Sequence, residues 1–266
     1  MVKPRVIVLR AAGTNCDKET AFAFQACGAE TELVHINQLK DKSKKLSDYQ
    51  ILAFPGGFSY GDDIAAGKIL ANELKYKLSE DIKKFISDGK LIIGICNGFQ
   101  VLVKSGLLPG NAQLEQEVTL TINDSAKFED RWTYLKGQGL SGKGQGKCVW
   151  AKGLPEIIYL PVAHGEGKFV AKDNGILERL KQSNQIVFQY CDQSGKLSGY
   201  PDNPNGSQEH IAGICDETGR ILGLMPHPER HSFGLQHPRW TKEGLKKEGD
   251  GLAIFKNDVE YVKKNL

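Results

Sequence analysis

The sequence predicts an α/β fold in which a doubly wound, mostly parallel central sheet is flanked by helices. Short apolar segments rich in β-branched residues alternate with helical stretches through the first hundred residues, a pattern typical of parallel sheets. Several strands of the second half have the spacing of antiparallel hairpins, so we expect extra antiparallel strands there. No low-complexity linker or internal repeat interrupts the 266 residues, which predicts a single domain over 1–266.

The first half is expected to supply the parallel strands and most of the helices. A helix is predicted over 17–26, with Asn15 or Asp17 as its N-cap. A longer amphipathic stretch over 62–87 has apolar residues at helical spacing and ends before Gly89. The strands between these helical stretches are predicted at 4–9, 31–36, 50–54 and 91–95.

The second half is richer in strands. One helix is expected there, over 252–264 near the end of the chain. The strands are predicted at 118–122, 132–135, 157–162, 168–171, 186–190, 211–215 and 221–224.

Composition and charge exclude several classes of function. The formal net charge of +3 is too small to indicate a nucleic-acid partner or an anionic membrane surface. The longest apolar runs are far shorter than a membrane span, and Arg10 interrupts the first of them before a signal peptide could form. The six cysteines have neither the density nor the spacing of a disulfide scaffold, so we expect a reducing, cytoplasmic compartment.

The segment around Cys96 carries the clearest chemical signal. The buried strand 91–95 runs into Gly94-Ile95-Cys96-Asn97-Gly98, and a helical segment follows. A strand, a G-x-C-x-G turn and a helix form a nucleophile elbow, in which we expect the flanking glycines to permit the sharp turn. The helix N-terminus then favours a thiolate over a thiol. The alternative is an inert cysteine at the end of a core strand, and the spacing of the two glycines favours the nucleophile.

A cysteine nucleophile needs a base, a group that orients the base, and donors for the oxyanion. An apolar strand ends at Pro226 and is followed by His227 and Glu229, which point the same way if the segment is extended. We therefore expect Glu229 to bond one imidazole nitrogen and leave the other for Cys96. The Gly56-Gly57 pair and the backbone N–H of Asn97 are the predicted oxyanion donors.

Two other interpretations of these patterns are disfavoured. His231 and His237 could join His227 and Glu229 in a metal site, but Pro228 disfavours the helical geometry of such ligands, so no metal is predicted. The tract 137–146 contains G-x-G-x-x-G and nearly matches a phosphate-binding loop. It lacks the hydroxyl residue after Lys143 and a following helix, so we interpret it as a surface loop.

Taken together, these residues resemble a known family. Pro-Gly-Gly at 55–57, G-x-C-x-G-x-Q at 94–100 and His-Pro-Glu at 227–229 resemble the class I, or triad, glutamine amidotransferases, which implies a flavodoxin-like sheet. Further motifs are similar to those of the glutaminase subunits of phosphoribosylformylglycinamidine synthases, and they span almost the whole chain in order: 57–62, 96–100, 128–132, 164–167, 203–207 and 225–230.

The resemblance implies a role for each matching position. Cys96 would be the nucleophile, His227 the general base and acid, and Glu229 the group that orients His227. The substrate would be L-glutamine, cleaved through a γ-glutamyl thioester to glutamate and ammonia. The residues implied to bind the substrate or its oxyanion are Gly57, Asn97, Gln100 and His164, the last of which is equally compatible with a structural turn.

The resemblance also implies partners. Ammonia would pass to an ATP-dependent synthetase subunit that converts formylglycinamide ribonucleotide to formylglycinamidine ribonucleotide in purine biosynthesis, and a small third subunit would bridge the two. ATP and Mg²⁺ would then belong to the synthetase, and no cofactor is expected on this chain. Three alternatives stay open: a triad amidotransferase serving another synthetase, a cysteine hydrolase on a related fold whose base lies elsewhere, and a binding module that has lost the chemistry.

Overall fold

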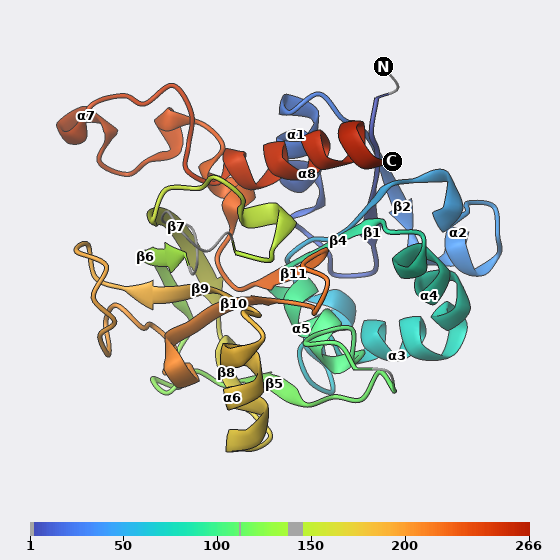
Figure 1. Ribbon diagram of the computed structural model, residues 1–266, viewed down its shortest axis with the longest axis horizontal. Helices are drawn as coiled ribbons and strands as arrows, with labels where there is room; N and C mark the ends of the chain where they lie inside the picture. The colour runs from blue at the N-terminus through green and yellow to red at the C-terminus, as the bar shows by residue number, and fades with distance from the viewer. Residues whose placement is uncertain (1–2, 112, 138–145) are drawn as a thin grey trace.

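A nine-stranded sheet runs through both halves of the chain in the computed structural model, which describes residues 3–111, 113–137 and 146–266 (Figure 1). The strands lie in the order β2-β1-β3-β4-β11-β10-β9-β6-β7. Neighbours from β2 to β11 are parallel, and neighbours from β11 to β7 are antiparallel. The predicted α/β fold, with a parallel sheet and added antiparallel strands in the second half, is confirmed.

The strands follow the apolar segments closely. The parallel part consists of β1 (Arg5–Arg10), β2 (Glu30–His35), β3 (Ile51–Phe54), β4 (Leu91–Ile95) and β11 (Ile221–Leu224). The antiparallel part consists of β6 (Glu129–Gly137), β7 (Ile157–His164), β9 (Ile186–Cys191) and β10 (Ile211–Cys215). A separate two-stranded sheet pairs β5 (Val118–Thr121) with β8 (Lys168–Ala171). Because one sheet joins the two halves, we propose that 1–266 is a single domain.

Helices cover both faces of the sheet (Figure 1). Phe24 on α1 and Phe255 on α8 pack in a T-shaped pair with ring centroids 4.9 Å apart, while α3 and α5 pack together on the opposite side of the strands. No helix within the described residues combines the length and the apolar character needed to cross a bilayer. The helices are α1 (Asp17–Ala26), α2 (Ile36–Lys40), α3 (Lys68–Lys77), α4 (Ser79–Ser87), α5 (Asn97–Lys104), α6 (Asn174–Gln182), α7 (Trp240–Glu243) and α8 (Leu252–Asn265).

The predicted helical stretch over 62–87 is wrong as a single element. Residues 59–62 form a 3₁₀ turn instead, and Gly67, with a φ of +73°, precedes α3. Leu78 leaves helical geometry between α3 and α4. The apolar spacing is satisfied by two short helices because each buries its own face, so periodicity alone did not reveal the break.

Two smaller differences have local causes. The N-cap of α1 is Cys16 rather than Asn15 or Asp17. Asp17 is the first residue of the helix itself, and its carboxylate pairs with Arg10 Nε at 2.6 Å. Helix α6 was not predicted, although Asp173 caps it by accepting a hydrogen bond from Ile176 N–H at 2.9 Å. The sequence signal for this helix was an N-cap aspartate, Asp173, followed by apolar residues at helical spacing.

Three parallel strands end side by side at one edge of the sheet. In the strand register Phe54 of β3 lies opposite Gly94 of β4, and Leu224 of β11 lies opposite Ile95. The segments that follow these strands therefore emerge together, as expected for the carboxyl edge of a parallel sheet. They contain Gly57, Cys96 and His227.

The turn from β4 into α5 depends on close backbone packing. A Cβ on Gly98 would lie 1.9 Å from the carbonyl oxygen of Phe54, and one on Gly94 would lie 2.6 Å from the carbonyl oxygen of Gly98. Neither glycine has a positive φ, whereas Cys96 between them does, at +51°. The glycines thus provide room for the helix rather than the conformational freedom that the sequence suggested, and Cys96 itself holds the strained conformation.

Replacing Gly98 with alanine should therefore disrupt the elbow. The added methyl group would overlap a backbone carbonyl that cannot rotate away, so we expect a loss of about 2–3 kcal/mol of unfolding free energy, or failure to fold. Thermal and urea unfolding of Gly98→Ala measure this. Gly199→Ala is the matched control because a Cβ there has no atom within 4 Å; equal stability of the two variants would contradict the packing argument.

A second prediction concerns Asp258, which is fully buried in α8 with neither carboxylate oxygen hydrogen-bonded to any described residue. Burial raises its pKa well above the ordinary value. The folded state therefore binds this proton more tightly than the unfolded state, so the stabilisation is complete below the unfolded pKa and is lost as pH rises through the folded pKa.

The unfolding free energy of Asp258→Asn should accordingly exceed that of the wild type by about 1–3 kcal/mol at about pH 8, and the difference should shrink toward about pH 4. Urea unfolding across this pH range provides the measurement. Glu260→Gln, an exposed acid on the same helix, is the control and should change stability little. A pH-independent difference for Asp258→Asn would contradict the interpretation.

Candidate active site

Cys96 occupies the strained position of the predicted elbow. It joins β4 to the N-terminus of α5 with φ +51° and ψ −106°, and its side chain lines a pocket of about 290 Å³. Its Sγ lies 3.7 Å from the carbonyl oxygen of Ala163 in β7. The helix N-terminus beside the sulfur favours negative charge there.

His227 and Glu229 form a buried pair just after β11. His227 Nδ1 and Glu229 Oε1 are 2.6 Å apart, and the backbone N–H of His227 donates to Pro161 O at 2.8 Å. Glu229 lies in a 3₁₀ turn, Pro228–His231, rather than in an extended segment. The turn still brings the carboxylate to the imidazole, so the expected His–Glu contact is present although its backbone geometry was predicted wrongly.

Cys96 and His227 interact electrostatically. Burial by itself lowers the pKa of His227, but the Glu229 carboxylate and then the Cys96 sulfur outweigh it and raise that pKa above the ordinary value. The imidazole also interacts with the thiols of Cys16 and Cys96, and both contacts raise its pKa further. The arrangement therefore leaves one imidazole nitrogen bonded to the carboxylate and the other available for proton transfer.

The predicted oxyanion donors lie at the same pocket. Gly57 lines it with φ +136°, and a Cβ there would lie 2.7 Å from the backbone nitrogen of Asn15. Asn97 is the first residue of α5, directly after Cys96. Its side chain is occupied elsewhere: Oδ1 accepts from Ser59 N–H at 3.1 Å, and Nδ2 donates to Gln100 Oε1 at 2.9 Å. Any oxyanion contact from Asn97 must come from its backbone.

Gln100 and His164 also line the pocket. Gln100 Nε2 donates to Glu166 O at 2.6 Å, which ties α5 to the loop after β7. His164 is buried, and burial, aided by the positive charge of His227, lowers its pKa to about 3. A neutral His164, with Nε2 3.5 Å from Asn205 Nδ2, is therefore a wall of the pocket rather than a charged group.

Among the polar pocket residues, Cys16, Asp62 and Arg230 were given no role by the sequence analysis, and Glu166 lies in the segment 164–167 that the resemblance associates with the pocket. The pocket thus has carboxylates at Asp62 and Glu166 and a guanidinium at Arg230. A signal existed for Cys16, since Asn15-Cys16-Asp17 follows β1 and so emerges at the same carboxyl edge as Cys96. The other three lie within the quoted motifs, where proximity to the site could not be read from spacing.

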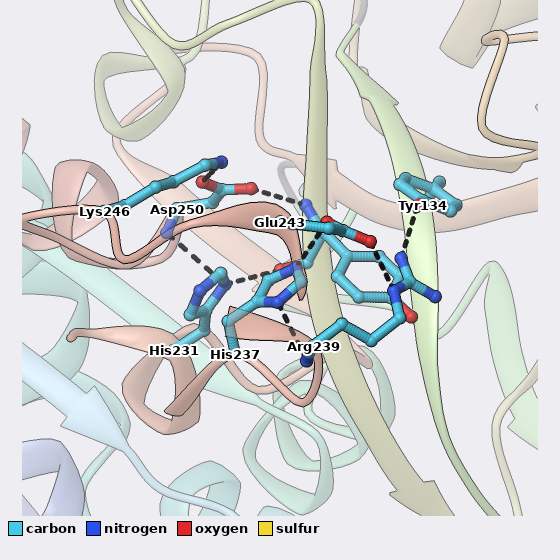
Figure 2. Close-up of polar contacts among 8 residues, drawn as sticks. Tyr134, His231, His237, Arg239, Glu243, Lys246 and Asp250 are labelled. Carbon is cyan, nitrogen blue, oxygen red and sulfur yellow. Dashed lines mark hydrogen bonds and ion pairs between the residues drawn. The ribbon is translucent and has the colours of Figure 1, made fainter. Parts of the chain in front are cut away.

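His231 and His237 lie in a separate cluster (Figure 2). His231 Nδ1 is 2.7 Å from Tyr159 O, and its ring is perpendicular to that of Trp132 at 5.0 Å. His237 Nδ1 accepts from the N–H of Arg239 at 3.1 Å. These contacts fasten the segment after the His227–Glu229 turn to β6 and β7. In the part of the chain that the structure describes, the group of potential metal ligands around His227 includes neither imidazole.

Most of the glycine-rich tract 137–146 lies outside the described residues. Gly137 is the last residue of β6, and the description resumes at Gly146. The interpretation of this tract as a surface loop stays a prediction.

Comparison with known proteins places this site in a family. Residues 3–262 match the CobB/CobQ-like glutamine amidotransferase domain. The chain is 53% identical over 264 residues to phosphoribosylformylglycinamidine synthase subunit PurQ of Dehalococcoides mccartyi, covering 99% of each chain. It is 47% identical over 275 residues to the subunit of that name from Archaeoglobus fulgidus, covering 98% of this chain and 97% of the relative.

Solved structures agree. A chain of PurLQS from Thermotoga maritima matches with a TM-score of 0.73 and 31% identity, over 98% of this chain and 100% of that one. A glutamine amidotransferase from Thermotoga maritima matches at 14% identity with a TM-score of 0.55, covering 100% of both chains, and so shares the fold alone. The chain belongs to the CobB/CobQ-like glutamine amidotransferases and, within them, to the family of PurQ subunits of phosphoribosylformylglycinamidine synthase.

Proposed function

We propose that the chain is the glutaminase component of phosphoribosylformylglycinamidine synthase and that Cys96, His227 and Glu229 are its catalytic triad. The observation that carries the assignment of the triad is that a strained Cys96 and His227 line one pocket, while Glu229 contacts His227 Nδ1 at 2.6 Å. Family membership supports glutamine as the substrate.

The first step is attack by the Cys96 thiolate on the side-chain carboxamide of glutamine. A thiol is activated when its proton passes to an adjacent imidazole. The Glu229 carboxylate stabilises the imidazolium that results and fixes its orientation through Nδ1. The carbonyl oxygen gains negative charge and is stabilised by the backbone N–H groups of Gly57 and Asn97.

The second half of the reaction regenerates the cysteine. His227 gives its proton to the departing nitrogen, so that ammonia leaves and a γ-glutamyl thioester remains on Cys96. Water activated by the same imidazole then hydrolyses the thioester to glutamate. Gln100 and His164 contribute to the walls of the substrate pocket.

Ammonia is passed on to a partner in this proposal. The Thermotoga maritima structure with the higher TM-score is of PurLQS, and we infer that this chain likewise assembles with a synthetase and with a small third subunit. ATP and Mg²⁺ would act on the synthetase, where formylglycinamide ribonucleotide is converted to formylglycinamidine ribonucleotide. The six free cysteines are compatible with a cytoplasmic location.

The three alternatives fare differently. A triad amidotransferase for another synthetase is disfavoured by the full-length similarity to PurQ subunits. A cysteine hydrolase with its base elsewhere is disfavoured by the position of His227 at the Cys96 pocket. A binding module without chemistry would not need the strained Cys96 or the buried pair, both of which are costly to maintain.

Cys96→Ala should abolish ammonia release from glutamine in the presence of the synthetase, ATP and formylglycinamide ribonucleotide. The thioester cannot form without the sulfur, so we expect a loss of about 10⁴-fold or more in kcat. Coupled detection of ammonia and glutamate measures it. Cys27→Ala, which alters a half-buried cysteine outside the pocket, is the control; an active Cys96→Ala would make Cys96 merely structural.

Glu229→Gln should lower kcat by about 10²–10⁴-fold with a smaller change in KM. The amide cannot stabilise the imidazolium, and the pKa of His227 should fall because its main raising influence is lost. The pH dependence of kcat and the NMR titration of His227 check both effects. An unchanged pH profile would show that Glu229 does not act through His227.

The isolated chain should be a feeble glutaminase that its partner activates. We expect addition of the synthetase with its substrates to raise glutamine turnover, because ammonia has a productive use only in the complex. Steady-state glutamate formation with and without the partner measures the effect. Equal turnover in both conditions would count against gating by the partner.

A further inference from the structure

The proposed mechanism leaves one thiol of the pocket without a role. Cys16 is 1% exposed and lines the pocket. Its Sγ donates to Asn15 Oδ1 at 3.1 Å and accepts from Arg230 Nη2, also at 3.1 Å. Burial raises the pKa of this thiol, and the neighbouring His227 and Arg230 offset that effect only in part.

Cys16 lies beside the His–Glu pair. One potential ligand atom from each of Cys16, His227 and Glu229 can be chosen so that all three lie within 4.8 Å of one another. Each of these residues is almost fully buried. Within the described part of the chain, Glu229 Oε2 has no hydrogen-bond partner, so the carboxylate keeps unused acceptor capacity.

Gly56 has no side chain, so its backbone lies close to both His227 and Cys16. A Cβ at that position would lie 2.8 Å from His227 Cε1 and 3.0 Å from Cys16 Sγ. Ligand atoms around a tetrahedral zinc ion are separated by about 3–4 Å, so small rotations of the three side chains would bring them into range. The pocket leaves a route for the ion and for a water molecule as fourth ligand.

The chemistry of the three groups suits a borderline cation. A thiolate, an imidazole and a carboxylate are ligands that Zn²⁺ takes in proteins, whereas Mg²⁺ and Ca²⁺ prefer oxygen alone. The thiolate and the carboxylate together carry the two negative charges that neutralise Zn²⁺. The adjacent Arg230 guanidinium is already paired with Glu19 at 2.9 Å, which reduces its repulsion of a metal ion.

We infer that Cys16, His227 and Glu229 form an inhibitory site for one zinc ion. Binding releases to solvent the thiol proton of Cys16 and the second imidazole proton of His227, and the ion occupies the imidazole nitrogen that is freed. His227 can then no longer carry protons for Cys96, and Glu229 no longer orients it. The site differs from simple capture of zinc by the reacting pair, because it needs Cys16 and does not need Cys96. The inhibition, but not the binding, rests on the proposed role of His227.

The test is titration of the full-length chain with Co²⁺ as a spectroscopic probe, followed by displacement with Zn²⁺. A cobalt–thiolate charge-transfer band of one ion per chain is expected in the wild type and in Cys96→Ser. Cys16→Ser should lose the band or weaken binding by about tenfold or more. Glu229→Gln is the second variant and should also weaken binding, and circular dichroism confirms that each variant is folded.

Cys27→Ser, at the other end of α1, is the matched control and should bind as the wild type does. In the assembled enzyme, the zinc concentration that halves glutaminase activity should rise about tenfold or more in Cys16→Ser. Loss of the band in Cys96→Ser with its retention in Cys16→Ser would overturn the inference, as would absence of any band in the wild type. Because Co²⁺ binding requires no turnover, failure of the proposed catalytic function would be seen separately.

Discussion

The pairing of β4 with parallel neighbours on both sides is the constraint on which the site depends. Its register with β3 and β11 fixes where each of the three strands ends. The segments after those strands contain Gly57, Cys96 and His227, to which the proposed mechanism assigns an oxyanion donor, the nucleophile and the base. Because hydrogen bonds along buried strands resist slippage, the three chemical groups are held by the sheet rather than by loops. A change of register by one residue would move the side chains of the strand to the opposite face of the sheet and separate the three chemical groups.

Close packing turns this alignment into a usable geometry. Helix α5 can start beneath Cys96 only because Gly98 lies against the carbonyl of Phe54 without a side chain. The strain at Cys96, with its φ of +51°, is tolerated because the strand before it and the helix after it are both buried. Two hydrogen bonds add to this: Asn97 Oδ1 accepts from Ser59 N–H in the turn after β3, and Gln100 Nε2 donates to Glu166 O in the loop after β7. The elbow is thus held by β4, by the turn after β3 and by the loop after β7.

Much of this was predictable from the sequence, for identifiable reasons. The buried strands are short apolar runs bounded by turn residues, and Cys96 and the His227–Glu229 pair lie at or just beyond their ends, where a parallel sheet places its sites. What the sequence could not reveal was any feature decided by contacts between distant segments. The break at Leu78, the position of Arg230 beside Cys16, and the occupation of the Asn97 side chain all depend on packing that spacing does not encode.

Burial of the His227–Glu229 pair explains why this chemistry needs such a framework. An ionised carboxylate taken out of water is destabilised by several kcal/mol unless a partner compensates it. Here the partner is an imidazole 2.6 Å away, and Glu229 retains a second oxygen without a hydrogen bond to any described residue. That uncompensated oxygen strengthens the attraction for positive charge on His227, which is what a base needs when it accepts a proton from a thiol. The same property suits the pair to bind a cation, so the proposed catalysis and the proposed inhibition by a metal ion have one physical cause.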